Sequence, residues 1–245
     1  FEEVADKFGN LGLKELCSQP IKYAEEGVVV SPRVSFDWDV HRKKLLGSSA
    51  KFYLDSGKPY KAGDLFKAPM QAEVLRQIAA HGSKGFYHSD ITTDLVNSLK
   101  ELGGVHSIAD FENVKVQYVD PTYADLKDGS TLIELPPNGQ GLTAIMMKKM
   151  MQFCNIDQFS AGSFERVHLE AEIAKIAYSA RNNFIGDPNF SEVKQNVFLD
   201  DPYLEKLSKE ISLGKLIDHN LGDDFFTRNK DTVLICAADN AGNAI

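Results

Sequence analysis

The feature that most constrains the fold is one long helical segment in the second half of the chain. It runs from about Ser163 to Phe184 and is ended by Gly186-Asp187-Pro188, because proline cannot continue a helix. Its predicted inward-facing residues are Val167, Ala171, Ala174 and Ala177. A chain built around such a helix is predicted to be largely helical.

Further segments with helical spacing or helix-boundary residues surround this one. Ser31-Pro32 and Asp90 are predicted helix starts, and Gly27, Gly82 and Gly103-Gly104 are predicted stops. One helix carries Met146, Met147, Met150 and Met151, which predict an adaptable core rather than a cofactor site. The predicted helices cover residues 1–8, 21–26, 32 to about 46, 70–81, 91–102, the segment after Gly141, and 202–211.

A few strands are expected late in the chain. Val114–Val119 alternates apolar and polar residues, and Ser130–Leu135 is a second predicted strand after the turn signal Asp128-Gly129. The apolar run Thr232–Ala238 predicts a buried strand, followed by a tight turn over Asp239–Asn243 and a new strand at Ala244. The predicted fold class is α+β, or part of a layered αββα protein.

Charge and apolar patterning exclude two kinds of partner. The formal net charge of −8 argues against nucleic acid and anionic membranes, since phosphate binding needs clustered Lys and Arg. No apolar stretch approaches the ~18 residues of a membrane helix. The cysteines Cys17, Cys154 and Cys236 form no CxxC and favour a reducing compartment, so the cytoplasm is expected, with the periplasm left open.

Residue types alone indicate little catalytic or metal-binding chemistry in this chain. No metal site or cofactor is predicted: His168-Leu169-Glu170 lacks the later PCxxC of a deaminase, and HExxH and GxSxG motifs are absent. The turn Pro136-Pro137-Asn138-Gly139-Gln140-Gly141 could hold an anion at a helix N-terminus, but a simple tight turn is favoured. The remaining histidines are expected to cap helices or lie at the surface: His41, His81, His88, His106 and His219.

Several stretches, read in order, resemble the gamma-glutamyltransferase family. Leu75–Gly82 with Gly85-Phe86-Tyr87 is similar to its "L..IA..G..aFY" segment, and the stretch from His168 to Pro188 to its "H..aEa...AyaDR...yGDP" segment, with Ala180 where aspartate is usual. Asp231-Thr232, with Asp239–Ala244 seven residues on, resembles the processing junction. Other matches are Leu102-Gly103-Gly104, Ala109-Asp110-Phe111 and Glu134–Gly141.

The resemblance spans residues 1–245 and implies an N-terminal-nucleophile hydrolase made as an inactive precursor. Thr232 would attack the carbonyl of Asp231, and after cleavage would act as nucleophile with its own amine as base. A free α-amine, with a reference pKa of ~7.7–8.0, can serve as a base near neutral pH, and a threonine hydroxyl needs one. Gly242 and Asn243 are expected to form the turn, and Arg181 and Glu172 to be structural, as a helix-surface ion pair.

The resemblance also implies a domain division and a substrate class. Residues 1–231 would belong to the large-subunit region and residues 232–245 would begin the small, catalytic subunit region of a four-layer αββα protein. The substrate would be a small-molecule amide, gamma-glutamyl or other, and the partner the protein's own small-subunit region. The variants PPNGQG and Thr232-Val233-Leu234 resemble the amidohydrolase branch, which includes oxamate-hydrolysing enzymes.

One alternative function from another class stays open. A helical binding or scaffold module, in which Thr232 only packs, competes with the enzyme.

Because the chain begins Phe1-Glu2-Glu3 without methionine, it is also predicted to be a piece of a longer protein. The substrate-carboxylate arginine and the oxyanion-hole glycines would then lie outside it, and this fragment alone would be inactive.

Overall fold

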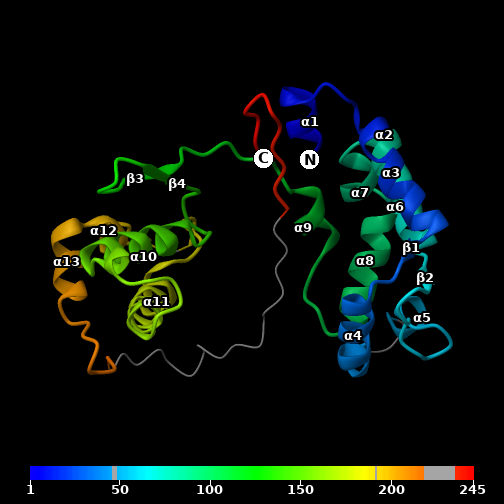
Figure 1. Ribbon diagram of the computed structural model, residues 1–245. Coiled ribbons are helices and arrows are strands. Elements are labelled where there is room, and N and C mark those ends of the chain that lie inside the picture. Colours follow the sequence, from blue (N-terminus) through cyan, green and yellow to red (C-terminus); the bar gives the residue numbers. More distant parts are fainter. Residues whose placement is uncertain (46–48, 191, 218–234) are drawn as a thin grey trace. The chain divides into compact units, whose positions relative to one another are not determined.

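The computed structural model describes residues 1–45, 49–190, 192–217 and 235–245. Contacts divide the chain into two compact units, Phe1–Gln117 and Tyr118–Ile245. Figure 1 shows that helices predominate in both. The predicted boundary between residues 231 and 232 lies outside the described residues and stays a prediction.

The first unit is made of short helices and one two-residue strand pair. β1 (Val28–Val29) pairs antiparallel with β2 (Leu65–Phe66), and the sequence predicts neither strand. The helical elements are α1 (Glu2–Phe8), α2 (Leu13–Leu16), α3 (Ser18–Glu26), α4 (Pro32–His41), η1 (Arg42–Lys44), α5 (Ser49–Tyr53), α6 (Pro69–His81), α7 (Lys84–Tyr87), α8 (Asp90–Glu101) and α9 (Ile108–Glu112).

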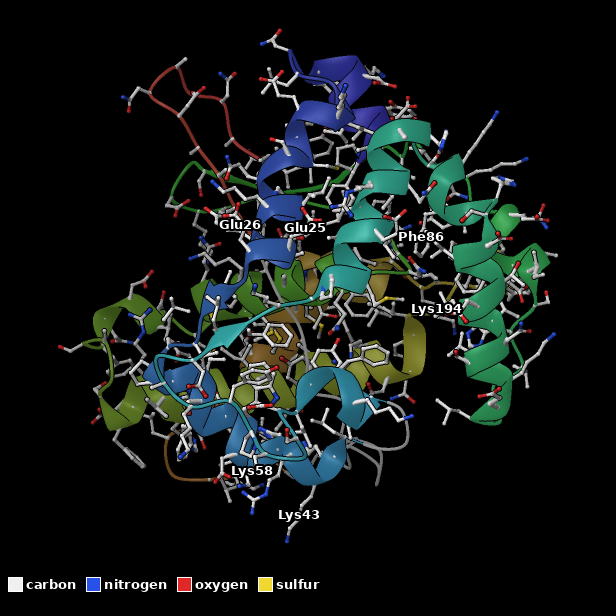
Figure 2. The ribbon with its side chains drawn as sticks, turned by 90° about the vertical axis from the view of Figure 1, so that its right-hand side faces the viewer. Glu25, Glu26, Lys43, Lys58, Phe86 and Lys194 are labelled. Carbon is white, nitrogen blue, oxygen red and sulfur yellow. The ribbon has the colours of Figure 1, made fainter. Side chains whose placement is uncertain are left out.

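Helices α3 and α6 pack side by side, and an ion pair joins them. Figure 2 labels Glu25 near the C-terminal end of α3, where its carboxylate accepts a hydrogen bond from Arg76 of α6. Glu73 of the same helix also contacts Arg76, at 3.3 Å. These three side chains are all partly exposed, so their contribution is to alignment more than to stability.

Helix starts follow the predicted chemistry with one shift. The Ser31 hydroxyl accepts from the Val34 amide at 3.3 Å and so caps α4, as predicted. That helix ends at His41 instead of near residue 46. At α8 the cap is Ser89, whose hydroxyl accepts from Ile91, and Asp90 is the first helical residue.

The second unit contains the larger described core. Its helical elements are α10 (Gly141–Phe153), η2 (Ile156–Gln158), α11 (Phe164–Phe184), α12 (Asn196–Leu199) and α13 (Asp201–Ser208). Met146 and Met150 of α10 are fully buried, and Met147 and Met151 pack against the same cluster, which confirms the core reading of the four methionines. The other buried members are Leu142, Ile173, Ile176, Ala177, Ala180, Phe198 and Leu204.

The inward face of α11 differs from the predicted one. Val167 is 54% exposed, while Ile173, Ile176 and Ala177 are buried. The two isoleucines present more apolar surface than Ala171 and Ala174, so burying their face stabilises the packing more. Of the four residues predicted to face inward, Ala177 is the one that is fully buried.

The strand prediction is half right. β4 (Thr131–Glu134) lies within the predicted second strand and follows the predicted turn, but its partner is β3 (Thr122–Asp125). Val114–Val119 is not a strand in the structure, and Val116 and Tyr118 are over 60% exposed. An alternating pattern becomes a strand only when another strand accepts its hydrogen bonds, and among the described residues none does.

The antiparallel pair β3–β4 lies next to α10. Ala124 is buried and Leu132 is half-buried, whereas Tyr123 and the residue opposite it, Ile133, are more than half exposed.

Among the described residues no helix is both long and apolar enough to cross a membrane.

Candidate active site

The two predicted site residues, Asp231 and Thr232, lie outside the described residues, which stop at 217 and resume at 235. The predicted self-cleavage therefore stays a prediction. The structure does describe both flanks of that junction: the segment that ends at Ile217 and the hairpin that starts at Ile235.

The downstream flank is a short hairpin whose turn is the predicted one, Asp239–Asn243. The amide of Ala237 donates to the Ile245 carbonyl at 3.0 Å, and the Ile245 amide donates back at 2.9 Å. Gly242 has a φ of +86°, a conformation that glycine adopts without strain. Gly242 and Asn243 thus form the turn, as expected from the sequence.

The Asp239 carboxylate holds this turn together. It accepts from the amides of Ala241 and Asn243, each at 2.9 Å, and from the Asn243 side-chain amide at 2.7 Å. These hydrogen bonds, led by that of the Asn243 side chain, hold the pKa of Asp239 below its usual value. The sequence D-x-x-G-N therefore specifies a self-contained turn seven positions after Thr232.

The strand before this turn is not buried in its described part. Ile235 is 83% exposed, and Cys236 to Ala238 are exposed as well. The burial predicted for this strand requires other elements that cover it, and among the described residues none does, so it stays a prediction. Within the described part of the chain, Ala237 and Ala238 pair only with residues 244 and 245.

The upstream flank, Ser212–Ile217, is held by one face of α11. His168 Nε2 lies 3.0 Å from the Ser212 carbonyl oxygen. The Ile217 amide donates to Glu172 Oε2 at 2.7 Å, and Lys175 Nζ donates to the Ile217 carbonyl at 3.1 Å. Ile217 is thus hydrogen-bonded through both its backbone amide and its backbone carbonyl.

Glu172 is a buried, ionised anchor in this arrangement. Its side chain is 3% exposed and forms an ion pair with Lys175 at 2.7 Å. Burial alone would raise the pKa of Glu172, but the hydrogen bonds from Lys175 and from the Ile217 amide outweigh it, so the pKa lies below its usual value.

The expected ion pair between Arg181 and Glu172 is wrong. Glu172 pairs with Lys175, which lies one helical turn away. Arg181 is nine residues from Glu172 on the same helix, too far for the two side chains to meet. Arg181 instead donates to Gln140 Oε1 at 2.8 Å and lies 4.6 Å above the Tyr178 ring. Its structural role is to tie α11 to the PPNGQG turn.

This PPNGQG turn leads directly into α10. A β-carbon placed at Gly141 would come within 2.5 Å of the Leu135 carbonyl oxygen and 3.2 Å of Glu134 Oε2, so only glycine fits there. A carboxylate of the chain itself therefore lies beside the N-terminus of α10. This arrangement favours the tight-turn reading over an anion site.

Other candidate groups stand apart from one another. In the described ranges no group of three or more metal-ligating side chains is found, and the three cysteines are free. His41 Nδ1 lies 2.9 Å from the Asp37 carbonyl, at the end of α4, which agrees with an expected capping role. His219 lies outside the described residues.

The contacts of His168 and Lys175 were missed at the sequence level. The available signal was their spacing with Glu172, since positions i, i+4 and i+7 lie on one face of a helix. The sequence gives no partner for that face, because Ser212–Ile217 is more than 35 residues further on.

Comparisons with known proteins agree with the motif order. The family model for gamma-glutamyltranspeptidase matches residues 1–245. A glutathione hydrolase proenzyme of Bacillus subtilis (strain 168) is 27% identical over 216 residues, 88% of this chain and 37% of that protein. The acylase ACY 1 proenzyme of Pseudomonas sp. (strain SE83) is 27% identical over 248 residues, 99% of this chain and 44% of that protein.

The fold is shared as well. The crystal structure of Helicobacter pylori gamma-glutamyltranspeptidase matches with a TM-score of 0.80 and 25% identity, over 93% of this chain and 68% of that one. This confirms the predicted fold class, a mostly helical α+β fragment of an N-terminal-nucleophile hydrolase. The chain spans about two fifths of the length of these curated relatives. Because the family model matches the whole chain, the chain belongs to the gamma-glutamyltranspeptidase family.

Proposed function

We propose that the protein to which this chain belongs is a self-processing amide hydrolase or acyltransferase with Thr232 as its nucleophile. The observation that carries the proposal is the match of the family model over the whole chain. The sequence around Asp231-Thr232, which resembles the family's processing junction, supports it. The curated relatives named proenzymes support a precursor that is cleaved.

Cleavage of the junction proceeds in two steps. The Thr232 hydroxyl oxygen bonds to the Asp231 carbonyl carbon as the C–N bond to Thr232 breaks, and the hydroxyl proton passes to the nitrogen, which leaves an ester and a free amine. Water then hydrolyses the ester, releasing the Asp231 carboxylate and restoring the hydroxyl. The new α-amine lies next to that hydroxyl and can act as its base near pH 7–8.

The mature enzyme uses the same chemistry on its substrate. The Thr232 hydroxyl attacks the substrate amide, the amine product leaves, and the acyl-enzyme is resolved by water or by an amine acceptor. The rest of the site, including the group that binds the substrate carboxylate, is proposed to come from parts of the full protein outside residues 1–245.

Two substrate classes compete within this proposal. The glutathione hydrolase relatives favour a gamma-glutamyl amide. A smaller amide such as oxamate is favoured by the junction Thr232-Val233-Leu234 and the turn PPNGQG, which resemble the amidohydrolase branch.

A direct assay separates the classes. Matured full-length protein is incubated with gamma-glutamyl-p-nitroanilide, glutathione or oxamate, with and without an amine acceptor, and product formation is measured. We expect hydrolysis of one class that falls by at least ~10³-fold in Thr232→Ala, because that variant lacks the hydroxyl that attacks the amide. Thr232→Ser keeps a hydroxyl at that position and is the matched control that should retain activity.

The scaffold alternative makes the opposite prediction. A full-length protein that hydrolyses none of these amides, and whose binding partners are unaffected by Thr232→Ala, would replace the enzyme with a helical binding module.

A further inference from the structure

Three side chains on one face of α11 converge on the segment that leads toward the junction. His168, Glu172 and Lys175 contact the backbone of Ser212–Ile217, and we call these three residues the α11 clamp. Their spacing of four and three residues places them in a row along the helix. The clamp holds a short turn, in which Ser212 bridges to Lys215, and its end at Ile217.

The hydrogen bonds to the Ile217 backbone are of the strong, charge-assisted kind. Its amide and its carbonyl each bond to an ionised side chain, and such charge-assisted bonds are roughly twice as strong as neutral ones. The Ile217 side chain also packs against the core cluster. Position and direction of the backbone at residue 217 are therefore both fixed.

The buried pair of Glu172 and Lys175 is not the most favourable way to stabilise a helix. Burying the Glu172 carboxylate, whose side chain is 3% exposed, carries a desolvation penalty that the Lys175 partner offsets only in part. An apolar pair at these positions could pack against the core without it. The presence of the pair is better explained by its contacts with the Ile217 backbone than by a contribution to the stability of the fold.

We propose that Glu172 is a positioning residue for self-cleavage, acting through the Ile217 backbone. This inference rests on the proposed function. Asp231 follows Ile217 by fourteen positions, so the clamp fixes the near end of the segment that must present the Asp231 carbonyl to Thr232. Lys175 holds the Glu172 carboxylate and the Ile217 carbonyl, and His168 holds the start of the turn.

The expected size of the effect follows from conformational entropy. Without the clamp, the backbone of Ile217 must be ordered again for cleavage, and this loss of backbone entropy corresponds to about 10-fold in rate.

The test is the rate of self-cleavage of the full-length precursor, followed by gel or intact mass. We expect Glu172→Ala to slow cleavage by about 10-fold, while the fully processed variant keeps amide turnover within about 3-fold of the wild type. The matched control is Glu170→Gln on the same helix, whose carboxylate pairs with Arg166 at 3.0 Å instead of with Ile217. This control should cleave within about 2-fold of the wild-type rate.

Several outcomes overturn the inference. The inference is wrong if Glu172→Ala cleaves at the wild-type rate. It is also wrong if cleavage, mature turnover and thermal stability fall equally, because that result marks a merely structural role. The proposed function fails separately, if the wild-type precursor does not cleave at all.

A second variant keeps the inference testable if Glu172→Ala does not fold. Glu172→Gln preserves the volume but removes the negative charge, so the contacts that Oε2 makes with the Ile217 amide and with Lys175 lose the strength that the carboxylate charge gives them. Hydrogen exchange is measured on the peptide containing Ile217, in a precursor held uncleaved by Thr232→Ala. We expect faster exchange at Ile217 together with slower cleavage when Thr232 is present. Unchanged exchange, or faster exchange with wild-type cleavage, contradicts the inference.

Discussion

At the residue scale, the Asp239 carboxylate shows how one side chain specifies a turn. It accepts three hydrogen bonds from Ala241 and Asn243, and these are lost when it is protonated. Its pKa is lowered in the folded turn, so the contribution is present above the ordinary carboxyl pKa of ~3.9 and is lost as the pH falls through the lower, folded value.

This predicts a pH titration that NMR can follow. The amide resonances of Ala241 and Asn243 should shift with a common midpoint below ~3.9, and Asp239→Asn should abolish that transition. A midpoint at or above ~3.9 would mean that the carboxylate does not hold the turn.

A second residue-scale prediction concerns the methionine core. Met150 is fully buried in the cluster between α10, α11, α12 and α13, whereas Met70 on α6 is 67% exposed. Met150→Ala should lower the free energy of unfolding by about 2–5 kcal/mol, because it leaves a cavity. The same substitution at Met70 should change it by less than about 0.5 kcal/mol. Urea denaturation of both variants measures the difference, and equal losses would contradict this core.

Residue-level prediction from sequence succeeded where chemistry is local. Four methionines at helical spacing predicted a core, and D-x-x-G-N predicted a turn; both depend on neighbours a few positions away. The ion pair between Glu172 and Arg181 was wrong, since the partner of Glu172 within reach is Lys175 and its second partner, Ile217, is remote in sequence.

At the element scale, helix α8 tests which side chain caps its start. The sequence predicts Asp90, but the structure assigns the cap to Ser89, which accepts from the Ile91 amide at 3.3 Å and donates to the Phe86 carbonyl at 3.0 Å. Ser89→Ala should lower the free energy of unfolding by about 1 kcal/mol.

The matched variant is Asp90→Asn. It removes only the favourable interaction of a charge with the helix dipole, so its cost should be at most about 0.5 kcal/mol. Thermal denaturation of the two variants checks the order, and a larger loss in Asp90→Asn would restore the aspartate as the cap.

Element boundaries were predictable mainly for helices, because their start and stop signals are local. The sequence predicts a helix over 70–81 with Gly82 as its stop, for example, and α6 runs from Pro69 to His81. The strands were harder, because a strand exists only with a partner: Val114–Val119 has the right alternation yet stays unpaired among the described residues, whereas the short β3 pairs with β4.

At the scale of the whole molecule, motif order carried more information than any single motif. The family was recognisable from stretches spread over residues 1–245, and the family model and the shared fold confirm it. The division of the described chain near residue 117 was not predicted, since no glycine- or proline-rich linker marks it.

The central claim is that Thr232 cleaves the bond before it. The most direct measurement is the intact mass and N-terminal sequence of the full-length protein after purification. We expect two chains, the smaller one beginning Thr232-Val233-Leu234-Ile235, and one uncut chain in Thr232→Ala. An uncut wild-type protein, or a new N-terminus at any other residue, would contradict it.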